Sequence, residues 1–261
     1  MAQLNIVADK TAMSEAAAER ITSLVEAAVA ARGVAALSLT GGATPDLLYQ
    51  FLADQNRAWR SRIDWDHVHL FWGDEREVPP DHAESNFGLA NRFLIQHVPV
   101  PPTQIHRMRG ELPASDAGRL YDALLRARRD QIAGPLFDVM LLGLGDNAHI
   151  ASIFPDSPLL ERSERPERPE RSERSERLAT GVHVPEMSQW RITMTPPALL
   201  DSAAIVMIAN GASKADAIAT AVEGALDIAR YPAQLLRAAD DRVEWIIDSA
   251  ASARLRGAPP A

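Results

Sequence analysis

Short apolar runs alternate with longer segments of helical periodicity along the 261-residue chain. The short runs, several rich in β-branched residues, are typical of strands, whereas the longer segments repeat apolar positions at helical spacing. Strands are predicted at residues 4–8, 34–39, 68–72, 137–142, 191–195, 203–209 and 243–247. Helices are predicted at 11–32, 45–54, 85–97, 114–132 and 214–222. This alternation indicates one α/β domain, residues 1–261, with a mostly parallel sheet and helices on both faces.

Composition narrows the range of partners and compartments. The chain holds no cysteine, which excludes disulfides, thiolate nucleophiles and cysteine-ligated metals, and fits a cytoplasmic protein. The formal net charge of −8 disfavours nucleic acid and anionic membranes as partners. Residues 1–10 lack a secretory signal, and the longest apolar run, 203–209, is too short to span a bilayer. We expect a cytoplasmic protein that acts on a small molecule, and we expect a monomer.

One segment of low complexity interrupts this pattern. From residue 161 to residue 177 the pair Glu-Arg recurs, separated by Ser or Pro. The segment has no apolar residue to bury, and Pro166 and Pro169 would interrupt a helix. We expect a solvated loop or disordered insert within the domain, with an electrostatic docking strip as the alternative.

A glycine-rich turn follows the second predicted strand, in the sequence Leu-Ser-Leu-Thr-Gly-Gly-Ala-Thr-Pro of residues 37–45. Gly41 and Gly42 let a ligand approach the backbone closely. Ala43 and Thr44 lead into the next helix, and Thr44 suits its N-cap. Free amides and the positive end of the helix dipole favour a phosphate there. Because the turn lacks the lysine of a P-loop, a tight connection without a ligand is the alternative.

Charged residues follow the third predicted strand, in the sequence Phe-Trp-Gly-Asp-Glu-Arg of residues 71–76. Ligands of parallel sheets bind beyond the carboxyl ends of the strands, which makes Asp74 and Arg76 candidates. Arg76 suits phosphate oxygens, and Asp74 suits either Arg76 or sugar hydroxyls. A surface ion-pair cluster is the alternative. His67 and His69 are expected to be structural, because no third metal ligand accompanies them.

The strand at 137–142 leads into a second glycine-rich loop, Gly-Leu-Gly-Asp-Asn-Ala-His at residues 143–149. His149 is the candidate general base, because an imidazole titrates near neutral pH and this one follows a strand end. Further along the chain, Arg191 begins a predicted strand and Lys214 opens a helix. Lys214 suits a phosphate, and a solvated helix lysine is its alternative.

Taken together, these segments resemble the 6-phosphogluconolactonase family, within the wider group that includes glucosamine-6-phosphate deaminases. The stretches that carry the resemblance occur in the family's order and run through most of the chain. They are residues 38–45, 72–79, 84–86, 143–155, 191–195, 210–214 and 232–235.

The resemblance implies a Rossmann-like α/β fold with neither metal nor organic cofactor. It implies hydrolysis of 6-phospho-D-glucono-1,5-lactone, a phosphorylated sugar lactone, to 6-phosphogluconate in the pentose phosphate pathway. In the family the histidine at the place of His149 is the base that activates water. The residues at the places of Arg76 and Lys214, with the Gly-Gly turn, hold the substrate phosphate.

Two residues before the candidate base depart from the family pattern, which has Asp-Gly where this chain has Asn147 and Ala148. Asn147 keeps a hydrogen-bonding group but lacks the negative charge of an aspartate. The loss of that charge would lower the pKa of His149. Ala148 is strained only if its backbone needs a positive φ. Asp146 would compensate for the lost charge if its carboxylate faced the imidazole.

Two other functions compete with lactone hydrolysis. The first is isomerisation and deamination of glucosamine 6-phosphate, which by family analogy needs a carboxylate paired with the catalytic histidine. Asn147 counts against that chemistry. The second is a sugar-phosphate-binding protein without catalysis, which the altered residues before His149 keep open. Release of ammonia, or binding of 6-phosphogluconate without turnover of the lactone, would distinguish them.

Overall fold

The computed structural model describes residues 3–160 and 177–256. Its main feature is a six-stranded sheet in which every pair of neighbours is parallel. The order is β1-β9-β8-β5-β2-β3. The strands are β1 (Gln3–Val7), β2 (Ala35–Leu39), β3 (Val68–Trp72), β5 (Phe137–Gly143), β8 (Ser202–Ala209) and β9 (Val243–Asp248). The mostly parallel sheet expected from the sequence is confirmed.

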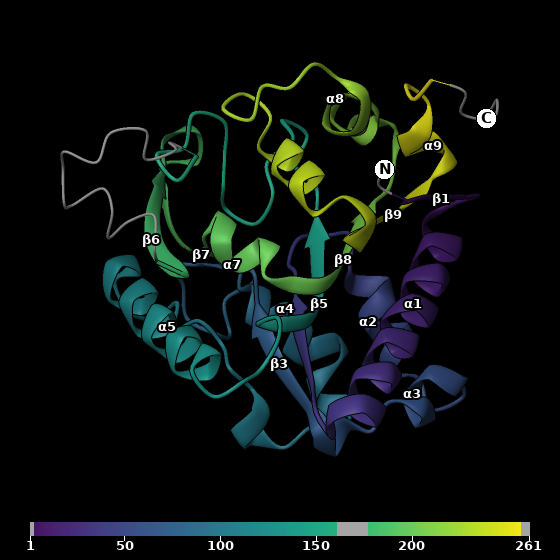
Figure 1. Cartoon of the computed structure of the whole chain (residues 1–261), viewed down its shortest axis with the longest axis vertical. Helices are drawn as coiled ribbons and strands as arrows, with labels where there is room; N and C mark the ends of the chain where they lie inside the picture. Colours follow the sequence, from purple (N-terminus) through teal and green to yellow (C-terminus); the bar gives the residue numbers. More distant parts are fainter. Residues whose placement is uncertain (1–2, 161–176, 257–261) are drawn as a thin grey trace.

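Helices cover both faces of this sheet (Figure 1). The α-helices are α1 (Lys10–Arg32), α2 (Asp46–Ala53), α3 (Ala58–Arg62), α4 (Asn86–Phe93), α5 (Ala114–Arg129), α7 (Pro196–Leu200), α8 (Ala215–Glu223) and α9 (Ser249–Ser252). Short 3-10 segments include η4 (Pro185–Met187) and η5 (Ala212–Lys214), and a longer one is η6 (Pro232–Arg242). Helices α1, α2 and α4 pack on one face, and α5, α7, α8 and η6 on the other.

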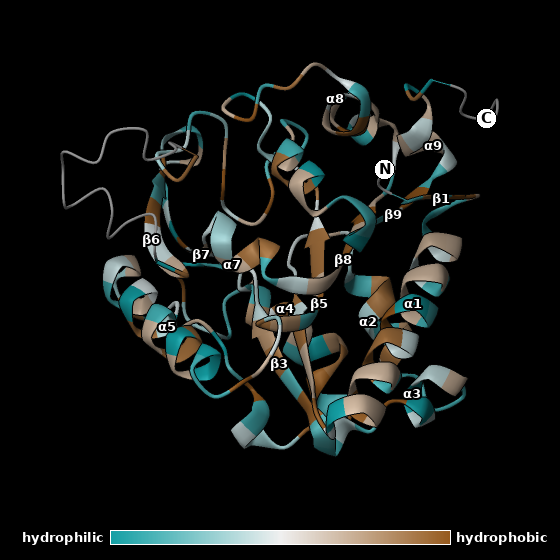
Figure 2. Ribbon diagram, viewed as in Figure 1, coloured by the Kyte–Doolittle hydropathy of each residue, from teal (hydrophilic) through white to brown (hydrophobic). Residues whose placement is uncertain are grey.

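Strand β5 shows why the sequence is apolar at successive positions in this region. Its side chains alternate between two cores, with Val139 and Leu141 on the α1 side and Met140 and Leu142 on the other. A strand that is covered on both faces needs an uninterrupted apolar run. Figure 2 shows the apolar residues concentrated on the central strands and the polar ones toward solvent.

The first helix illustrates how local sequence sets an element's ends. The Asp9 carboxylate accepts a hydrogen bond from the amide of Ala12 at 2.9 Å, which caps the start of α1. Gly33 ends the helix with a φ of 75°, a left-handed conformation that glycine adopts at little cost. By contrast, the prediction that Thr44 caps the next helix is wrong. Helix α2 begins at Asp46, its N-cap position is Pro45, and no side chain caps it.

A second, three-stranded sheet was not anticipated. It is antiparallel in the order β4-β7-β6, from strands β4 (Asp74–Arg76), β7 (Gln189–Met194) and β6 (Ala179–Val184). The strand predicted at 191–195 belongs here, and not to the parallel sheet. Strand β4 follows β3 directly after Gly73, so the chain passes from one sheet into the other at this residue.

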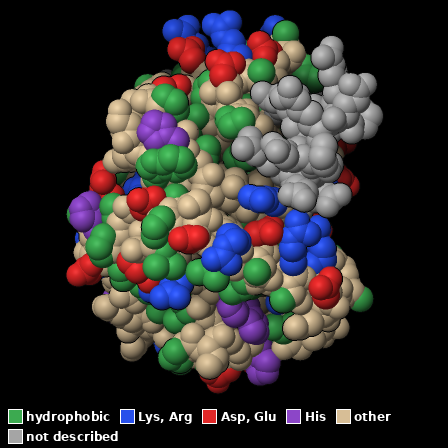
Figure 3. Space-filling view, turned by 90° about the vertical axis from the view of Figure 1, so that its left-hand side faces the viewer, with side chains coloured by type: hydrophobic (Ala, Val, Ile, Leu, Met, Phe, Trp, Pro, Cys, Tyr) green, Lys and Arg blue, Asp and Glu red, His purple; other side chains and the backbone are tan. Residues whose placement is uncertain are grey.

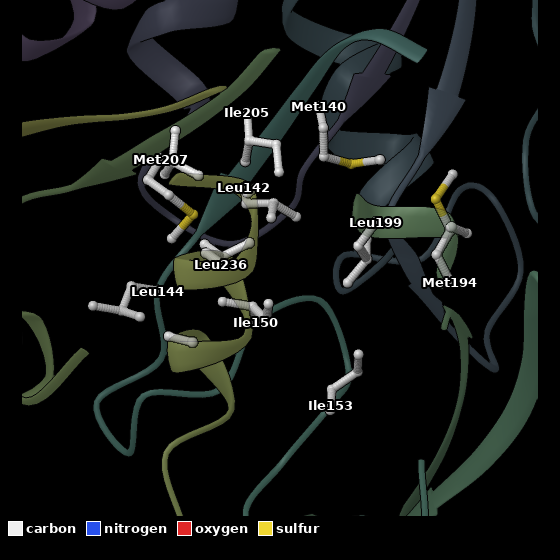
Figure 4. Packing of buried hydrophobic residues seen from close by; sticks show 14 of the residues in the cluster. Met140, Leu142, Leu144, Ile150, Ile153, Met194, Leu199, Ile205, Met207 and Leu236 are labelled. Carbon is white, nitrogen blue, oxygen red and sulfur yellow. The ribbon is translucent and has the colours of Figure 1, made fainter. Parts of the chain in front are cut away.

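The two sheets share one apolar core. Met140 and Leu142 of β5 lie in the same buried cluster as Met194 of β7. Figure 4 shows these side chains together with others of the cluster, among them Ile150 and Ile153 from the loop that follows β5. Both isoleucines are buried. Each such side chain contributes about 1.5–3 kcal/mol of burial free energy. The loop that carries His149 is therefore anchored on a packed core.

Two further expectations from the sequence concern the low-complexity insert and membrane-spanning helices. The insert expected at 161–177 lies, except for Arg177, outside the described residues. Among the helices of the described ranges, none combines the length and the apolar character that a membrane crossing requires. On the face that carries α5 and β6, basic and acidic side chains are intermixed (Figure 3).

Candidate active site

The carboxyl ends of four neighbouring strands, β8, β5, β2 and the edge strand β3, open on one cavity of about 400 Å³. Every candidate site residue from the sequence lines it: Gly41, Gly42, Ala43, Thr44, Asp74, Arg76, His149, Arg191 and Lys214. Lys10 and Asn86, which sequence reasoning did not select, line it too. A hollow of about 600 Å³ elsewhere is lined by parts of α2 and α4 and by none of these residues.

His149 lies in this cavity with one ring nitrogen already engaged. Its Nδ1 is 2.7 Å from Oδ1 of Asn147, and its ring stacks on Phe154 with centroids 4.0 Å apart. An amide oxygen accepts, so Nδ1 carries the proton, and Nε2 keeps the lone pair that a base needs. Gly145 makes room for the ring, because a Cβ there would lie 2.0 Å from Nδ1.

Burial lowers the pKa of His149 to about 4. The nearby negative charge of Asp74 acts to raise this pKa, whereas the positive charges of Arg191 and Lys214 act to lower it. Desolvation disfavours the imidazolium, and here it outweighs the attraction of the carboxylates. The free protein therefore holds His149 as a neutral imidazole at physiological pH.

Asp74 is buried in a network that joins β4 to β7, to the start of α4 and to the loop after β5. Its Oδ2 accepts a hydrogen bond from Oγ of Ser152 at 2.5 Å, and its Oδ1 accepts one from Nδ2 of Asn86 at 3.1 Å. Its ion-pair partner is Arg191, with Nη1 and Oδ2 3.8 Å apart. The suggestion that Asp74 holds Arg76 is thus corrected, because Arg76 Nη1 donates to the carbonyl of Glu84 instead.

Arg76 and Arg191 are directly paired across β4 and β7. Both residues line the cavity, and the Nε of each is buried without a hydrogen-bond partner among the described residues. Like charges opposite each other on a sheet repel, and an unsatisfied buried donor costs free energy. A bound anion would relieve both penalties.

Glu75, between the two site residues of β4, faces away into the protein. Its carboxylate accepts hydrogen bonds from the amides of Arg76, Asn86 and Phe87 and from Oγ of Ser85. It therefore holds the start of α4 against β4. Burial nevertheless raises the pKa of Glu75 above its usual range. Its role is to position Asn86, whose Oδ1 would lie 1.7 Å from a Cβ at Gly41.

The glycine-rich turn after β2 is held by a lysine from another element. Lys10 Nζ donates to the carbonyl of Ala43 at 2.9 Å and pairs with Asp46 at 2.7 Å. Gly42 has a φ of 84°, which explains glycine at that position. Lys10 therefore brings a cation to the predicted phosphate turn. No local pattern marks this lysine, which simply opens an alanine-rich helix.

Lys214 lies just before α8 and pairs with Asp146, with Nζ and Oδ1 2.7 Å apart. The hydrogen bond from Lys214 lowers the pKa of Asp146. The Asp146 carboxylate thus pairs with the lysine, whereas the hydrogen bond to the imidazole Nδ1 comes from Asn147. The compensation by Asp146 that the sequence left open is therefore at most an effect of charge at a distance.

Ala148 does adopt the conformation that the sequence analysis identified as a difficulty. Its φ is 61°, and the residue is 1% exposed. Its carbonyl accepts a hydrogen bond from the amide of Ala233 at 2.9 Å, so the loop is tied to η6. The strained conformation, about 1–2 kcal/mol for a residue with a Cβ, is held by this packing.

His69 of β3 and His67, which lies in the 3-10 turn just before that strand, have partners of their own. His69 Nδ1 lies 2.9 Å from His106 Nε2, with the rings stacked, and His67 contacts Asp64. Within residues 3–160 and 177–256, no group of three or more His, Cys, Asp or Glu side chains is arranged to hold a metal ion.

Comparison with known proteins places this geometry in a family. A sequence model described as glucosamine-6-phosphate isomerases/6-phosphogluconolactonase matches residues 8–245. A 6-phosphogluconolactonase of Mycobacterium tuberculosis is 36% identical over 97% of this chain and 98% of its own. One from Synechocystis is 33% identical, with the same coverage.

Among solved structures, the devB protein aligns with a TM-score of 0.81 and 29% identity. The alignment covers 98% of this chain and all of that one. The expected resemblance is therefore confirmed over nearly the full length. The chain belongs to the glucosamine-6-phosphate isomerase/6-phosphogluconolactonase family.

Proposed function

We propose that this protein hydrolyses 6-phospho-D-glucono-1,5-lactone to 6-phosphogluconate, in the pentose phosphate pathway. One observation carries the proposal. A neutral imidazole with a free Nε2 lies in the same cavity as the paired residues Arg76 and Arg191. The substrate needs both, because it combines a lactone carbonyl with a phosphate dianion. The curated relatives named above carry the same activity in their names.

In the proposed mechanism, His149 Nε2 takes a proton from water as the water oxygen attacks C1 of the lactone. The resulting tetrahedral intermediate collapses by breaking the bond between C1 and the ring oxygen. The imidazolium returns its proton to that leaving oxygen, which becomes the new hydroxyl group. C1 of the same, now open-chain molecule becomes a carboxylic acid group, which ionises. Such a positioned base accelerates proton transfer by roughly 10²–10⁴-fold.

The cations of the cavity supply binding and orientation. Arg76, Lys10 and Lys214 line the cavity together with the turn of Gly41 to Thr44, which is the proposed phosphate site. Arg191, fixed by Asp74, lies over the Phe154 ring on which His149 stacks, and it is placed to attract the lactone or its developing oxyanion. Holding the substrate at both ends converts binding free energy into positioning of C1, which is worth several kcal/mol.

We further infer a cytoplasmic monomer whose partner is the sugar phosphate alone, without nucleic acid or membrane. The absence of cysteine, the net charge of −8 and a cavity built from one chain support this inference. Light scattering of the purified protein at micromolar concentration would test the monomer, and a dimeric mass would contradict it.

The direct test follows loss of the lactone, generated in place, against its spontaneous rate. We expect fast turnover by the wild type and a rate at least 100-fold lower for His149→Ala, in the range of a lost general base. Asp116→Ala, at the start of α5 and outside the cavity, is the matched control. Ammonia release from glucosamine 6-phosphate would favour the deaminase activity instead. Tight binding of 6-phosphogluconate without turnover would indicate a sugar-phosphate-binding protein.

A further inference from the structure

The asparagine beside the base introduces an ambiguity that a carboxylate would not have. An amide can present either its oxygen or its NH₂ group to His149 Nδ1. With the oxygen presented, Nδ1 carries the proton and Nε2 is a base. With the NH₂ presented, Nδ1 must accept, the proton moves to Nε2, and the ring has no lone pair facing the cavity. Catalysis by His149 therefore depends on the orientation of the Asn147 amide.

The structure shows what contacts the other end of that amide. Asn147 Nδ2 donates to Oε2 of Glu186 at 3.2 Å. Glu186 lies in η4, the turn that connects strands β6 and β7. This turn is held beside the cavity because Met187 Sδ accepts from Nη2 of Arg191 at 2.9 Å. A chain of contacts thus runs from the Glu186 carboxylate through the Asn147 amide to the His149 imidazole.

We propose that Glu186 is a positioning residue, which holds the Asn147 amide with its oxygen toward His149 and so selects the tautomer with a free Nε2. This inference rests on the proposed function. A flipped amide would place its oxygen against the Glu186 carboxylate, so that two acceptors face each other. It would also turn NH₂ toward the backbone amide of His149, which donates to Asn147 Oδ1 at 3.2 Å. Both contacts favour the same orientation, and only one of them is made by a side chain.

The charge of Glu186 adds a second effect. A carboxylate that accepts from Nδ2 polarises the amide, which makes Oδ1 a stronger acceptor for the proton on Nδ1. This chain of contacts from Glu186 through Asn147 to His149, here called the relay, therefore supplies part of the negative charge that Asn147 itself lacks. Because Glu186 is exposed, its contribution is modest, and we expect an effect of the size of a single hydrogen bond.

The first experiment compares Glu186→Ala, Glu186→Gln and the control Asp116→Ala, which removes an exposed carboxylate from α5. We expect Glu186→Ala to lower kcat for the lactone by about three- to tenfold, the effect of one lost hydrogen bond, with little change in KM. Glu186→Gln retains an acceptor oxygen for Asn147 Nδ2 and should restore most of the loss. A kcat for Glu186→Ala equal to that of the control would overturn the proposal.

The second experiment repeats the substitution in a background without the amide, Asn147→Asp. A carboxylate at this position has two equivalent oxygens, so no group is needed to choose between them. In that background we expect Glu186→Ala to leave kcat unchanged or to raise it, since it removes a like charge close to the introduced carboxylate. The same loss in both backgrounds would show that Glu186 acts through another contact, and the proposal would be wrong.

The tautomer itself provides a readout that does not depend on turnover. Nitrogen-15 shifts of the His149 ring distinguish Nδ1–H from Nε2–H. We expect Nδ1–H in the wild type and a population of Nε2–H in Glu186→Ala. An unchanged tautomer would overturn the relay even if the lactone is the substrate. A shifted tautomer in a protein without lactonase activity would refute the proposed function and leave the relay standing.

Discussion

Arg76 of β4 and Arg191 of β7 stand directly opposite each other across an antiparallel strand pair, and both line the cavity. Arg191 has a carboxylate partner in Asp74, whereas the guanidinium of Arg76 donates to a backbone carbonyl. The pair is thus unequal. The positive charge of Arg76 is therefore less compensated than that of Arg191. Arg76 also lines the same cavity as the turn where we place the phosphate.

Substitution of Arg76 should therefore act mainly on binding. A hydrogen bond to a charged group contributes about 1.5–3 kcal/mol, and each 1.4 kcal/mol corresponds to a factor of about ten. We expect Arg76→Gln to raise KM for the lactone by about 10- to 100-fold and to change kcat less. Arg119→Gln, an exposed residue of α5, makes the same change in net charge away from the cavity. Equal KM values for the two variants would contradict the assigned phosphate site.

The two glycines of the Gly-Leu-Gly loop should respond differently to the same methyl group. A Cβ at Gly145 would lie 2.0 Å from His149 Nδ1, whereas one at Gly143 meets only Thr40 Oγ1 at 3.8 Å. A shift of the base by about 1 Å can lower the rate about 100-fold. We expect Gly145→Ala to lose kcat by that factor while Gly143→Ala stays near the wild type. Similar activities would show that the imidazole position is not critical.

The fall of kcat/KM at low pH, the acid limb of the pH profile, should reflect protonation of His149. A base works only when it is unprotonated, so activity persists at pH values above its pKa and falls below it. Because burial lowers the pKa of His149 to about 4, kcat/KM should stay level down to about pH 5 and then fall about tenfold per unit. A fall centred at about pH 6.5 would indicate an exposed base.

Asn147→Asp tests whether that limb belongs to His149. A carboxylate next to Nδ1 stabilises the imidazolium, so the pKa should rise and the limb should move to higher pH. His106, whose pKa burial also lowers to about 4, is part of the fold and not of the cavity. Circular dichroism across the same pH range would separate its titration from catalysis. A limb that Asn147→Asp leaves in place would have to come from another group.

Much of the parallel sheet could be predicted from the sequence, because a strand buried on both faces, such as β5, leaves an apolar run of its own. The rule that ligands bind beyond the carboxyl ends of parallel strands then placed Gly41, Asp74 and His149 at one edge of the sheet. These inferences needed only local sequence and the direction of the strands.

Contacts that depend on long-range pairing were not predictable in the same way. Strand β4 has three residues, and its partner β7 lies more than a hundred residues further along the chain, so no local pattern shows that they pair. The neighbourhood of Arg191 and Asp74 follows from that pairing. So does the position of Glu186, since the turn between β6 and β7 carries it to Asn147. The contact of Lys10 with the carbonyl of Ala43 also joins residues that are distant in the sequence, so no local pattern predicts it.

The backbone at Ala148 offers a test of strain that is independent of catalysis. Ala148→Gly removes a left-handed alanine, a gain of about 1–2 kcal/mol. It also removes a buried methyl group, which costs about 0.8 kcal/mol of stability. The greater entropy of the unfolded chain costs about 0.4–1 kcal/mol more. These effects nearly cancel, so we expect the free energy of unfolding to change by less than about 1 kcal/mol.

Ala17 provides the matched comparison, because it is equally buried but lies within α1 in an ordinary helical conformation. Ala17→Gly loses a methyl group and helix propensity together and should cost about 2 kcal/mol. Urea unfolding of both variants measures the difference. If Ala148→Gly cost as much as Ala17→Gly, the positive φ at Ala148 would carry no strain. The alanine that stands here in place of the family's glycine would then not need the contact with Ala233 to hold its backbone.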